Sequence, residues 1–283
     1  MDARSPGRRR GDVLSALAVA VLLLAGCDGT AQPVPRGGTA ANSLPPASGG
    51  FDYQLGGAYP ADVAVVVRDA GADPLPGAFN ICYVNGFQTQ PDEAEQWEDH
   101  PELLLTDDAG VPVVDPAWPD EYVLDPSSPA QRERILELVG PVLSGCAVAG
   151  FDAVEIDNLD TWTRFPAIDW SEARTLAEEY VDLAHSAGLM IGQKNAADMT
   201  AVAHGELGCD FAITEECGAY DECAAYTDVY GQQVLQIEYS DSLAAAGTTF
   251  AQVCALPDRA PLTILRDRGL VAQGEPGFVY EAC

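Results

Sequence analysis

The sequence predicts an α/β fold of the (β/α)8 TIM-barrel type, and three observations lead to this fold class. Short apolar runs alternate along the chain with segments that repeat apolar residues at helical spacing. The runs are apolar at nearly every position, which is typical of parallel strands covered on both faces. From Phe51 to Cys283 roughly 230 residues are available, which suits one such barrel. An open doubly wound sheet is the competing fold, but the chain lacks its usual nucleotide-binding turns, Gly-x-Gly-x-x-Gly and the P-loop.

Seven apolar runs are predicted as the buried strands of this barrel. They cover residues 64–67, 79–83, 153–156, 189–193, 211–214, 234–237 and 262–265. A barrel of this type needs eight strands, and we expect the eighth between Val111 and Leu124.

Helices are predicted between these strands. They cover residues 129–148, 170–187, 197–207, 221–230 and 242–254. The clearest is 129–148, where an apolar stripe includes Ile135 and Val139, and where Ser127 or Ser128 can cap the first turn.

The N-terminus predicts a targeting segment. Arg8–Arg10 precede an apolar run at 13–24 that is too short to span a bilayer comfortably. The run ends in Leu24-Ala25-Gly26-Cys27, which looks like a bacterial lipobox. We therefore expect residues 1–26 to be a signal peptide and Cys27 to carry the lipid, so that the exported protein is anchored at the bacterial cell envelope or surface. An ordinary secretory signal with a chance cysteine is the alternative.

A flexible tether is expected to follow. Residues 27–50 are rich in Gly, Pro, Ala, Ser and Thr and carry almost no large apolar side chain. Such a segment cannot bury enough surface to offset its ordering entropy. The predicted domains are thus the signal peptide at 1–26, the lipidated cysteine and tether at 27–50, and the barrel at 51–283.

The charge balance is strongly acidic, with 14 Lys and Arg against 44 Asp and Glu and a net charge of −30. Nucleic acid and anionic lipid surfaces need basic patches, so both are excluded as partners and the lipid anchor is the expected membrane contact. A cationic or neutral ligand is compatible. An acidic surface that serves only solubility is the alternative explanation. A monomer is expected.

Seven cysteines follow Cys27, and in an exported chain they predict disulfides. Seven leaves one unpaired, and the pairing cannot be read from the sequence. Cys82 lies inside an apolar strand and is the candidate for the buried free thiol, whereas Cys217 and Cys223 are close enough to staple a loop. A zinc site is the weaker alternative, because the Cys-x5-Cys spacing is not that of a zinc knuckle and the chain has only 3 histidines. No metal and no cofactor are expected.

Carboxylates gather where three predicted strands end, which is where active sites of such barrels lie. Glu155, Asp157 and Asp160 close one strand, and Glu215 and Glu238 close two others. Like charges repel, so a merely structural loop has no need of this cluster, and we expect one shared acidic pocket. Asp157 and Glu215 are the candidate catalytic pair, because one ionised and one protonated carboxyl are the equipment for cleaving a glycosidic bond.

Other interpretations of this acidic cluster remain open. Clustered acids also suit a shared Ca²⁺ or Mg²⁺ site. Glu155 or Asp160 could take the role of Asp157. Strand register is uncertain by a residue or two, so Glu216 could replace Glu215.

Lys194 is the only lysine in the chain and follows a predicted strand. We expect it to balance the pocket acids and to hold a substrate hydroxyl or lower the pKa of a neighbouring carboxylate; chance survival on the surface is the alternative. Trp162, directly after the acidic loop, is the favoured platform for a sugar ring. The candidate substrate-binding residues are Tyr83, Asn85, Glu155, Asn158, Asp160, Trp162, Lys194, Asn195 and Glu238.

Seven segments in order resemble the catalytic domain of glycoside hydrolase family 114, the endo-α-1,4-polygalactosaminidases and their relatives. They are Asp52–Tyr59, Ile81–Asn85, Gly150–Asp160, Gly192–Asn195, Glu215–Cys217, Tyr220–Cys223 and Ile237–Tyr239. The resemblance implies a (β/α)8 barrel, internal cleavage of a galactosamine-rich polysaccharide, and Asp157 and Glu215 as its paired acids. A partly deacetylated polymer of this kind is cationic, which suits an acidic cleft. The usually tryptophan-rich stretch at 117–122 and the residues after Asp241 match less well.

The leading hypothesis is therefore a surface-anchored glycoside hydrolase with Asp157 as nucleophile or base and Glu215 as acid. The alternative from another class is a non-catalytic lipoprotein that binds polysaccharide or amino sugar on the same barrel. A Ca²⁺-binding structural protein is a third reading.

Overall fold

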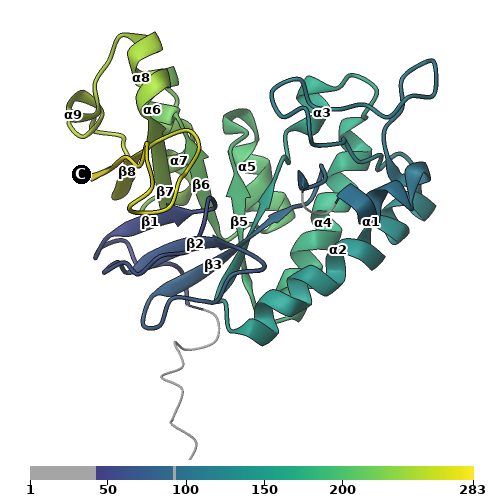
Figure 1. The fold of residues 1–283 in the computed structure, drawn as a ribbon, viewed down its shortest axis with the longest axis horizontal. Helices are drawn as coiled ribbons and strands as arrows, with labels where there is room; N and C mark the ends of the chain where they lie inside the picture. Colours follow the sequence, from purple (N-terminus) through teal and green to yellow (C-terminus); the bar gives the residue numbers. More distant parts are fainter. Residues whose placement is uncertain (1–42, 92–93) are drawn as a thin grey trace, which may run out of the picture. The chain divides into compact units, whose positions relative to one another are not determined.

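Eight parallel strands form the centre of the molecule in a computed structural model that describes residues 43–91 and 94–283 (Figure 1). Each strand pairs with the next one in the sequence, and a ninth, antiparallel strand pairs with the last. The strands are β1 Phe51–Gln54, β2 Val65–Asp69, β3 Phe79–Asn85, β4 Ala153–Asp157, β5 Met190–Lys194, β6 Phe211–Glu215, β7 Val234–Tyr239, β8 Leu262–Arg266 and β9 Tyr280–Ala282.

The sheet curls until β1 and β8 lie beside each other. Arg266 of β8 is fully buried and donates to the backbone oxygen of Tyr53 and, over 3.2 Å, to the Asp52 carboxylate. These bonds join the two ends of the sheet, and they satisfy a guanidinium and a carboxylate that would otherwise be buried at a cost. The fold is thus the predicted α/β barrel of the TIM type.

Helices cover the outer face of the strands. Helix α2 (Pro129–Ala149) is capped by Ser128, whose hydroxyl accepts from the Gln131 backbone as predicted, and it is followed by Gly150 in a left-handed conformation. Together with α4 (Trp170–Ser186) it packs beside β3, β4 and β5 (Figure 1). The helices are α1 Ala94–Glu98, α2 Pro129–Ala149, α3 Thr161–Arg164, α4 Trp170–Ser186, α5 Thr200–Val202, α6 Cys217–Tyr220, α7 Cys223–Tyr230, α8 Ser240–Ala246 and α9 Phe250–Val253, with shorter 3-10 or π turns η2 Pro101–Leu103, η3 Ala197–Met199 and η4 Ala203–Leu207.

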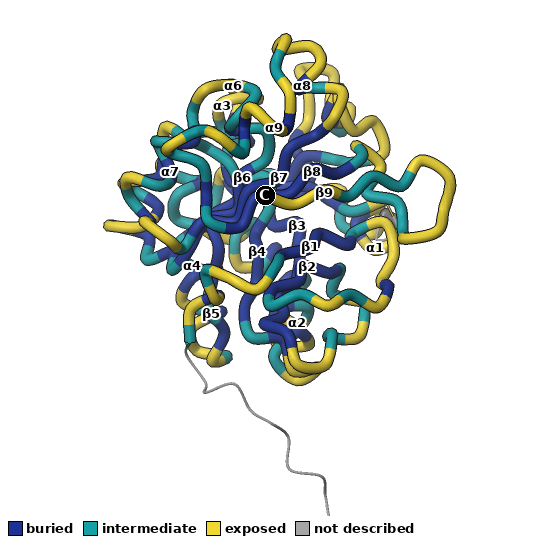
Figure 2. Tube along the Cα trace, turned by 90° about the vertical axis from the view of Figure 1, so that its left-hand side faces the viewer, coloured by how far each residue is buried: buried dark blue, intermediate teal, exposed yellow. Residues whose placement is uncertain are grey.

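Alternation along the strands divides the core into two parts. One set of side chains, such as Phe51, Ile81 and Ile237, fills the inside of the barrel. The other set, such as Val154 and Ile191, packs against the helices. Figure 2 shows the strands as the buried centre of the chain, with exposed segments around them.

Three expectations about the elements need correction. The eighth parallel strand is β1 and not a strand within 111–124, which forms only isolated bridges in a long excursion between β3 and α2. The strand β1 was not predicted because Asp52 and Gln54 are polar, although both are buried and hydrogen-bonded to each other. The helix expected at 242–254 is broken at Gly247 into α8 and α9, and the one at 197–207 is a series of short turns.

The disulfides are Cys82–Cys146, Cys217–Cys223 and Cys254–Cys283. The staple between Cys217 and Cys223 is confirmed. The prediction that Cys82 is the free thiol was wrong: its side chain leaves β3 on the outer face and meets Cys146 of α2. Among the described residues the free cysteine is the buried Cys209.

The signal peptide, Cys27 and the tether up to residue 42 lie outside the described residues. Within 43–91 and 94–283, no helix combines the length and the apolar character needed to cross a membrane.

Candidate active site

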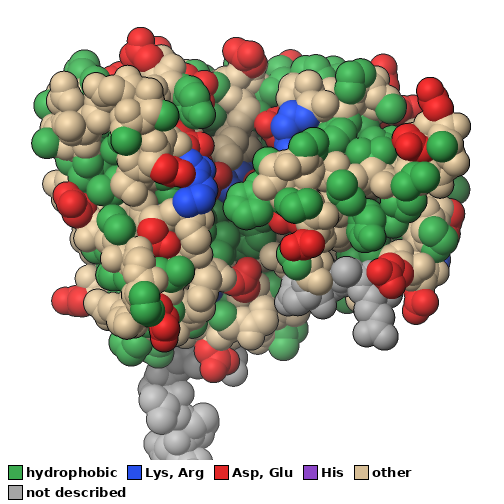
Figure 3. Space-filling view, turned by 45° about the horizontal axis from the view of Figure 1, so that its top comes forward, with side chains coloured by type: hydrophobic (Ala, Val, Ile, Leu, Met, Phe, Trp, Pro, Cys, Tyr) green, Lys and Arg blue, Asp and Glu red, His purple; other side chains and the backbone are tan. Residues whose placement is uncertain are grey.

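A cavity of about 490 Å³ opens at the carboxyl ends of the strands. Figure 3, in which the top of Figure 1 comes forward, shows a hollow on this face with basic side chains on either side. Active sites of such barrels lie at this end, because the loops that follow the strands meet here. The polar and aromatic residues that line the cavity include Tyr53, Asp69, Tyr83, Trp118, Glu121, Asp157, Asn158, Asp160, Arg164, Lys194, Asn195, Glu215, Glu216, Tyr239 and Arg268.

Lys194 stands at the floor of this cavity with only 3% of its surface exposed. Its Nζ lies 3.2 Å from Glu155, 3.4 Å from Asp157 and 3.1 Å from Glu215. Burial alone would lower the pKa of Lys194, but the three carboxylates raise it well above its ordinary value, so the ammonium form is held. The ammonium group occupies the place where these carboxylates would otherwise ligate Ca²⁺ or Mg²⁺, which argues against a shared metal site.

Asp157 is the last residue of β4, and two hydrogen bonds hold its carboxylate in addition to the contact with Lys194. The Tyr83 hydroxyl donates to its Oδ2 over 2.7 Å, and the Asn158 backbone N–H donates to its Oδ1 over 2.8 Å. Asn158 has a φ of 65°, in the left-handed region that Asn tolerates, and its side chain donates to Asn85 over 3.0 Å. The tight turn after β4 therefore fixes the direction of the Asp157 carboxylate.

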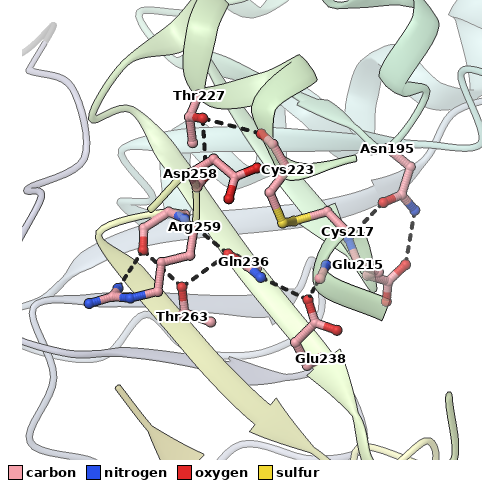
Figure 4. The surroundings of a disulfide bond; sticks show 12 residues. Asn195, Glu215, Cys217, Cys223, Thr227, Gln236, Glu238, Asp258, Arg259 and Thr263 are labelled. Atoms are coloured by element: carbon pink, nitrogen blue, oxygen red, sulfur yellow. Dashed lines mark hydrogen bonds between the residues drawn. A yellow bond between two sulfur atoms is a disulfide. The ribbon is translucent and has the colours of Figure 1, made fainter. Parts of the chain in front are cut away.

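Glu215 is the last residue of β6, and Asn195 holds it by two bonds. Asn195 accepts from the Glu215 backbone over 2.8 Å and donates to its Oε2 over 3.0 Å (Figure 4), while the Tyr239 hydroxyl donates to its Oε1. Burial would raise the pKa of Glu215, but the Lys194 charge and the hydrogen bonds outweigh it and lower that pKa below its ordinary value. The proton needed for a general acid must therefore be supplied to Glu215.

Glu155 lies one inward-facing position below Asp157 and is completely buried. The Tyr53 hydroxyl donates to its Oε1 over 2.8 Å. Burial raises the pKa of Glu155 to about 7, although the Lys194 charge opposes this. Glu155 therefore shares the inner side of the strand with Asp157, as the alternation of the strand predicts, but it lies beneath the cavity.

The structure separates Glu215 from Glu216. Glu215 faces Lys194 and Asn195, whereas Glu216 has a φ of 66° and turns to the rim, where it pairs with Arg268 at 2.5 Å. The partner of Asp157 across the floor is thus Glu215.

Several other predicted residues lie at or near the rim. Asp160 and Asn158 line the cavity, and both accept from Arg164, over 3.3 Å and 2.6 Å. Asn85 is buried behind Asn158 and donates to Glu121 over 3.1 Å. Asn85 therefore supports the loops of the cavity from behind.

Two predicted residues do not join this group. Glu238 leaves β7 on the outer face, where it is fully buried and accepts from Gly218 and Gln236 over 2.7 Å each (Figure 4). Its neighbour Tyr239 points into the barrel instead, because successive strand residues alternate. Trp162 packs against Trp170 at 5.1 Å between ring centroids and does not line the cavity.

Sequence reasoning missed residues that reach the cavity from the segments that follow the strands. Trp118, Glu121, Arg164 and Arg268 all line it. Burial and the nearby Asp157 charge raise the pKa of Glu121 to about 7. Trp118 was visible as one aromatic residue among several, but nothing in the spacing showed that the excursion at 111–124 folds over the barrel mouth.

The solved structures that share this fold include two glycoside hydrolases. Ega3 from Aspergillus fumigatus, crystallised in complex with galactosamine, is 19% identical with a TM-score of 0.62, and the match covers 87% of this chain and 99% of that chain. The glycoside hydrolase domain of PelA from Pseudomonas aeruginosa is 14% identical with a TM-score of 0.53, over 80% of this chain and 96% of that chain. No protein with a curated description matches the sequence. The sequence profile of glycoside-hydrolase family GH114 matches residues 32–283, most of the chain, and the protein therefore belongs to this family of glycosidases.

Proposed function

We propose that the protein is an exported glycoside hydrolase that cleaves internal α-1,4 bonds of a galactosamine-containing polysaccharide. The observation that carries the proposal is the pair Asp157 and Glu215, which end two strands and face one buried lysine at the floor of the cavity. Two carboxyl groups on opposite sides of a bound sugar are what glycosidic cleavage needs. The galactosamine bound in the related Ega3 structure supports an amino-sugar substrate.

The proposal includes retention of configuration, with which the distances in the site are compatible. Asp157 Oδ1 lies 3.4 Å and Glu215 Oε2 lies 3.1 Å from the same Nζ. These two oxygens can therefore be no more than about 6.5 Å apart, a bound that includes the separation of about 5–5.5 Å in retaining enzymes and meets the lower end of the range of about 6.5–9.5 Å in inverting ones. In a retaining enzyme the closer pair leaves no room for a water molecule behind the sugar, and one carboxylate attacks the sugar directly.

In this mechanism Asp157 attacks the anomeric carbon while Glu215 donates its proton to the leaving oxygen. Glu215 then removes a proton from water, which releases the sugar from Asp157. Tyr83 and Asn158 hold Asp157 in the orientation for attack, and Asn195 and Tyr239 hold Glu215. Lys194 keeps both carboxylates at fixed distances from each other.

The lining suits an amino sugar in particular. Arg164 and Arg268 pair with Asp160 and Glu216 at the rim, but the lining still holds six acidic side chains against three basic ones, and this excess attracts an ammonium group of the substrate. Trp118 is 52% exposed and offers a ring face for a sugar.

Lipid attachment at Cys27 is part of the proposal and rests on the lipobox at residues 24–27. Cells grown with labelled palmitate should label the wild-type protein and not Cys27→Ala, which should leave the membrane fraction. Labelling of the variant would remove this part of the proposal without touching the chemistry.

The test of the activity is product release from partly deacetylated galactosaminogalactan. The purified protein is compared with Asp157→Asn and Glu215→Gln, each checked for folding by circular dichroism. Oligosaccharides from the wild type, with at least about a thousandfold less from both variants, is the expected result. Binding of the polymer without any cleavage by the wild type would instead support a non-catalytic polysaccharide-binding protein.

A further inference from the structure

The floor of the cavity holds fewer positive charges than negative ones. One ammonium group, that of Lys194, faces the carboxyl groups of Glu155, Asp157 and Glu215 within 3.4 Å. If all three were ionised, the buried group would carry two uncompensated negative charges. In a poorly solvated site this arrangement is costly, so one carboxyl group holds a proton.

The burial and the hydrogen bonds of the three carboxyl groups indicate which of them holds the proton. The side chains of Asp157 and Glu215 are 19% and 21% exposed, whereas Glu155 is 0% exposed. Both oxygens of Asp157 and of Glu215 have partners, but Glu155 Oε2 has none among the described residues. An ionised carboxylate needs donors at both oxygens, so Glu155 is the member that is best kept neutral.

A proton on Glu155 has a short route to the catalytic pair. The hydrogen-bonding neighbours of Glu155 are the Tyr53 hydroxyl at 2.8 Å and Lys194 Nζ at 3.2 Å. The same Nζ lies 3.1 Å from Glu215 Oε2. Lys194 therefore bridges Glu155, which is sealed from solvent, and Glu215, which faces the substrate.

Building on the proposed function, we propose that Glu155 stores the proton that Glu215 delivers to the leaving group, and that Lys194 passes it from one to the other. In this step the Glu155 O–H bond and one Lys194 N–H bond break, while a new Lys194 N–H bond and a Glu215 O–H bond form. The lysine remains an ammonium group throughout, and Glu155 becomes the carboxylate. A turn of the Glu155 carboxyl about its Cγ–Cδ bond brings the protonated oxygen to Nζ.

Substrate binding supplies the driving force. A sugar that fills the cavity removes water from Glu215, and loss of water favours the protonated form of a carboxyl group. The phenols around the site do not compete for this role, because burial raises the pKa of each of Tyr53, Tyr83 and Tyr239 well above its ordinary value. The ionisable groups that face Glu155 and Lys194 are Tyr53 on β1, Tyr83 on β3, Asp157 on β4, Glu215 on β6 and Tyr239 on β7.

The first test is independent of the substrate. Infrared spectra of the free protein near pH 6 should contain an absorption band of a buried protonated carboxyl group that Glu155→Gln abolishes. Glu238→Gln is the matched control, because Glu238 is equally buried and its Oε2 also has no hydrogen-bond partner within the described part of the chain, but it lies on the outer face of β7. In the wild type, the band that Glu238→Gln removes should stay unchanged when galactosamine binds, whereas the Glu155 band should weaken. If the spectrum of Glu155→Gln contains every carboxyl band of the wild-type spectrum, the proposal is overturned.

The second test is the pH profile of kcat/KM. In Glu155→Gln the proton must be held by Glu215 alone, which has lost a negative neighbour, so the basic limb should move to lower pH by about one unit. Near the acid end of the profile the variant should recover most of the wild-type rate. An equal loss at every pH would show a structural role instead.

Tyr53→Phe keeps the proposal testable if Glu155→Gln does not fold. The Tyr53 hydrogen bond lowers the pKa of Glu155, so its loss should move the basic limb to higher pH, opposite to the shift in Glu155→Gln. A shift of both variants in the same direction would contradict the proposal. If the wild type cleaves no galactosamine polymer, the proposed function fails, but the infrared test still decides where the proton resides.

Discussion

Lys194 combines a structural and a chemical task in one side chain. It is the only lysine of the chain, it is nearly completely buried, and three carboxyl groups contact its ammonium group. Removal of one partner from a buried ion group leaves the others uncompensated, which usually costs more than the intact group contributes. The stability of this protein should therefore depend on Lys194 in a pH-dependent manner.

We expect Lys194→Met to lower the free energy of unfolding by about 3–5 kcal/mol at pH 8. Without the cation the folded-state pKa values of Glu155 and Glu215 rise, because the Lys194 charge that lowers them is lost, whereas in the unfolded chain they stay near 4. The loss should therefore grow as the pH rises from about 4 and be smaller at pH 5. Urea unfolding of variant and wild type at both pH values measures this, and equal losses would show that Lys194 acts through packing alone.

Trp118 tests the substrate contacts at the rim. It is 52% exposed and lines the cavity, so Trp118→Ala should raise KM roughly tenfold, as expected for one lost ring contact, with little change in stability. Tyr220→Ala is the matched control, because Tyr220 is 66% exposed and does not line the cavity. Steady-state kinetics on the polymer would compare them, and an equal rise of KM in both would exclude a specific role for Trp118.

At the scale of the elements, the end of β6 is the part of the barrel where stability and activity meet. Glu215 ends the strand, Glu216 takes a left-handed conformation, and Cys217 opens α6 with a disulfide to Cys223 at the start of α7 (Figure 4). Gly218 lies so close to Glu238 that a Cβ at this position would approach its Oε1 to 2.8 Å. The turn that aims Glu215 is therefore held by a covalent bond and by a close backbone contact.

Two disulfides that close loops of different length separate the effect on stability from the effect on activity. Loss of Cys217–Cys223, which closes 6 residues, should cost about 2 kcal/mol, and loss of Cys254–Cys283, which closes 29, about 3–4 kcal/mol. The double variant Cys217→Ser and Cys223→Ser should nevertheless reduce kcat more than the double variant Cys254→Ser and Cys283→Ser, because it loosens the turn after Glu215. Thermal unfolding and kinetics of the two double variants measure both quantities. A larger fall of kcat in the variant that lacks Cys254–Cys283 would contradict the role given to the turn after β6.

At the scale of the whole molecule, the charge of −30 acts on every approaching ligand. A cationic polymer should bind at least about tenfold more weakly at 500 mM than at 50 mM salt, since salt screens exposed charges beyond a few ångströms. A fully N-acetylated polymer of the same length is neutral and should bind almost independently of salt. Binding measured by calorimetry on a catalytically inactive variant makes the comparison. Equal salt dependence of both polymers would show that the acidic surface does not select the substrate.

Much of the barrel could be predicted from local patterns. Buried parallel strands are continuously apolar, so β2 to β8 are visible as runs, and the cap at Ser128 marks the start of α2. The strand β1 escaped this rule because Asp52 and Gln54 are polar, and their burial is tolerated only through bonds such as that from Arg266 at the far end of the sheet. Such a compensation between distant residues leaves no trace in local spacing.

The sequence alone determined the fold class, the end of the barrel that carries the chemistry, and the placing of Asp157, Glu215 and Lys194 where strands end, because strand periodicity and strand ends are local properties. Only the tertiary structure decided which of the neighbouring acids face one another. The alternation of β7 turned Glu238 outward and Tyr239 inward, the left-handed turn after β6 selected Glu215 over Glu216, and a remote loop brought Trp118 to the rim. These outcomes depend on register, on turn geometry and on contacts between residues far apart in the chain, which arise only when the barrel closes.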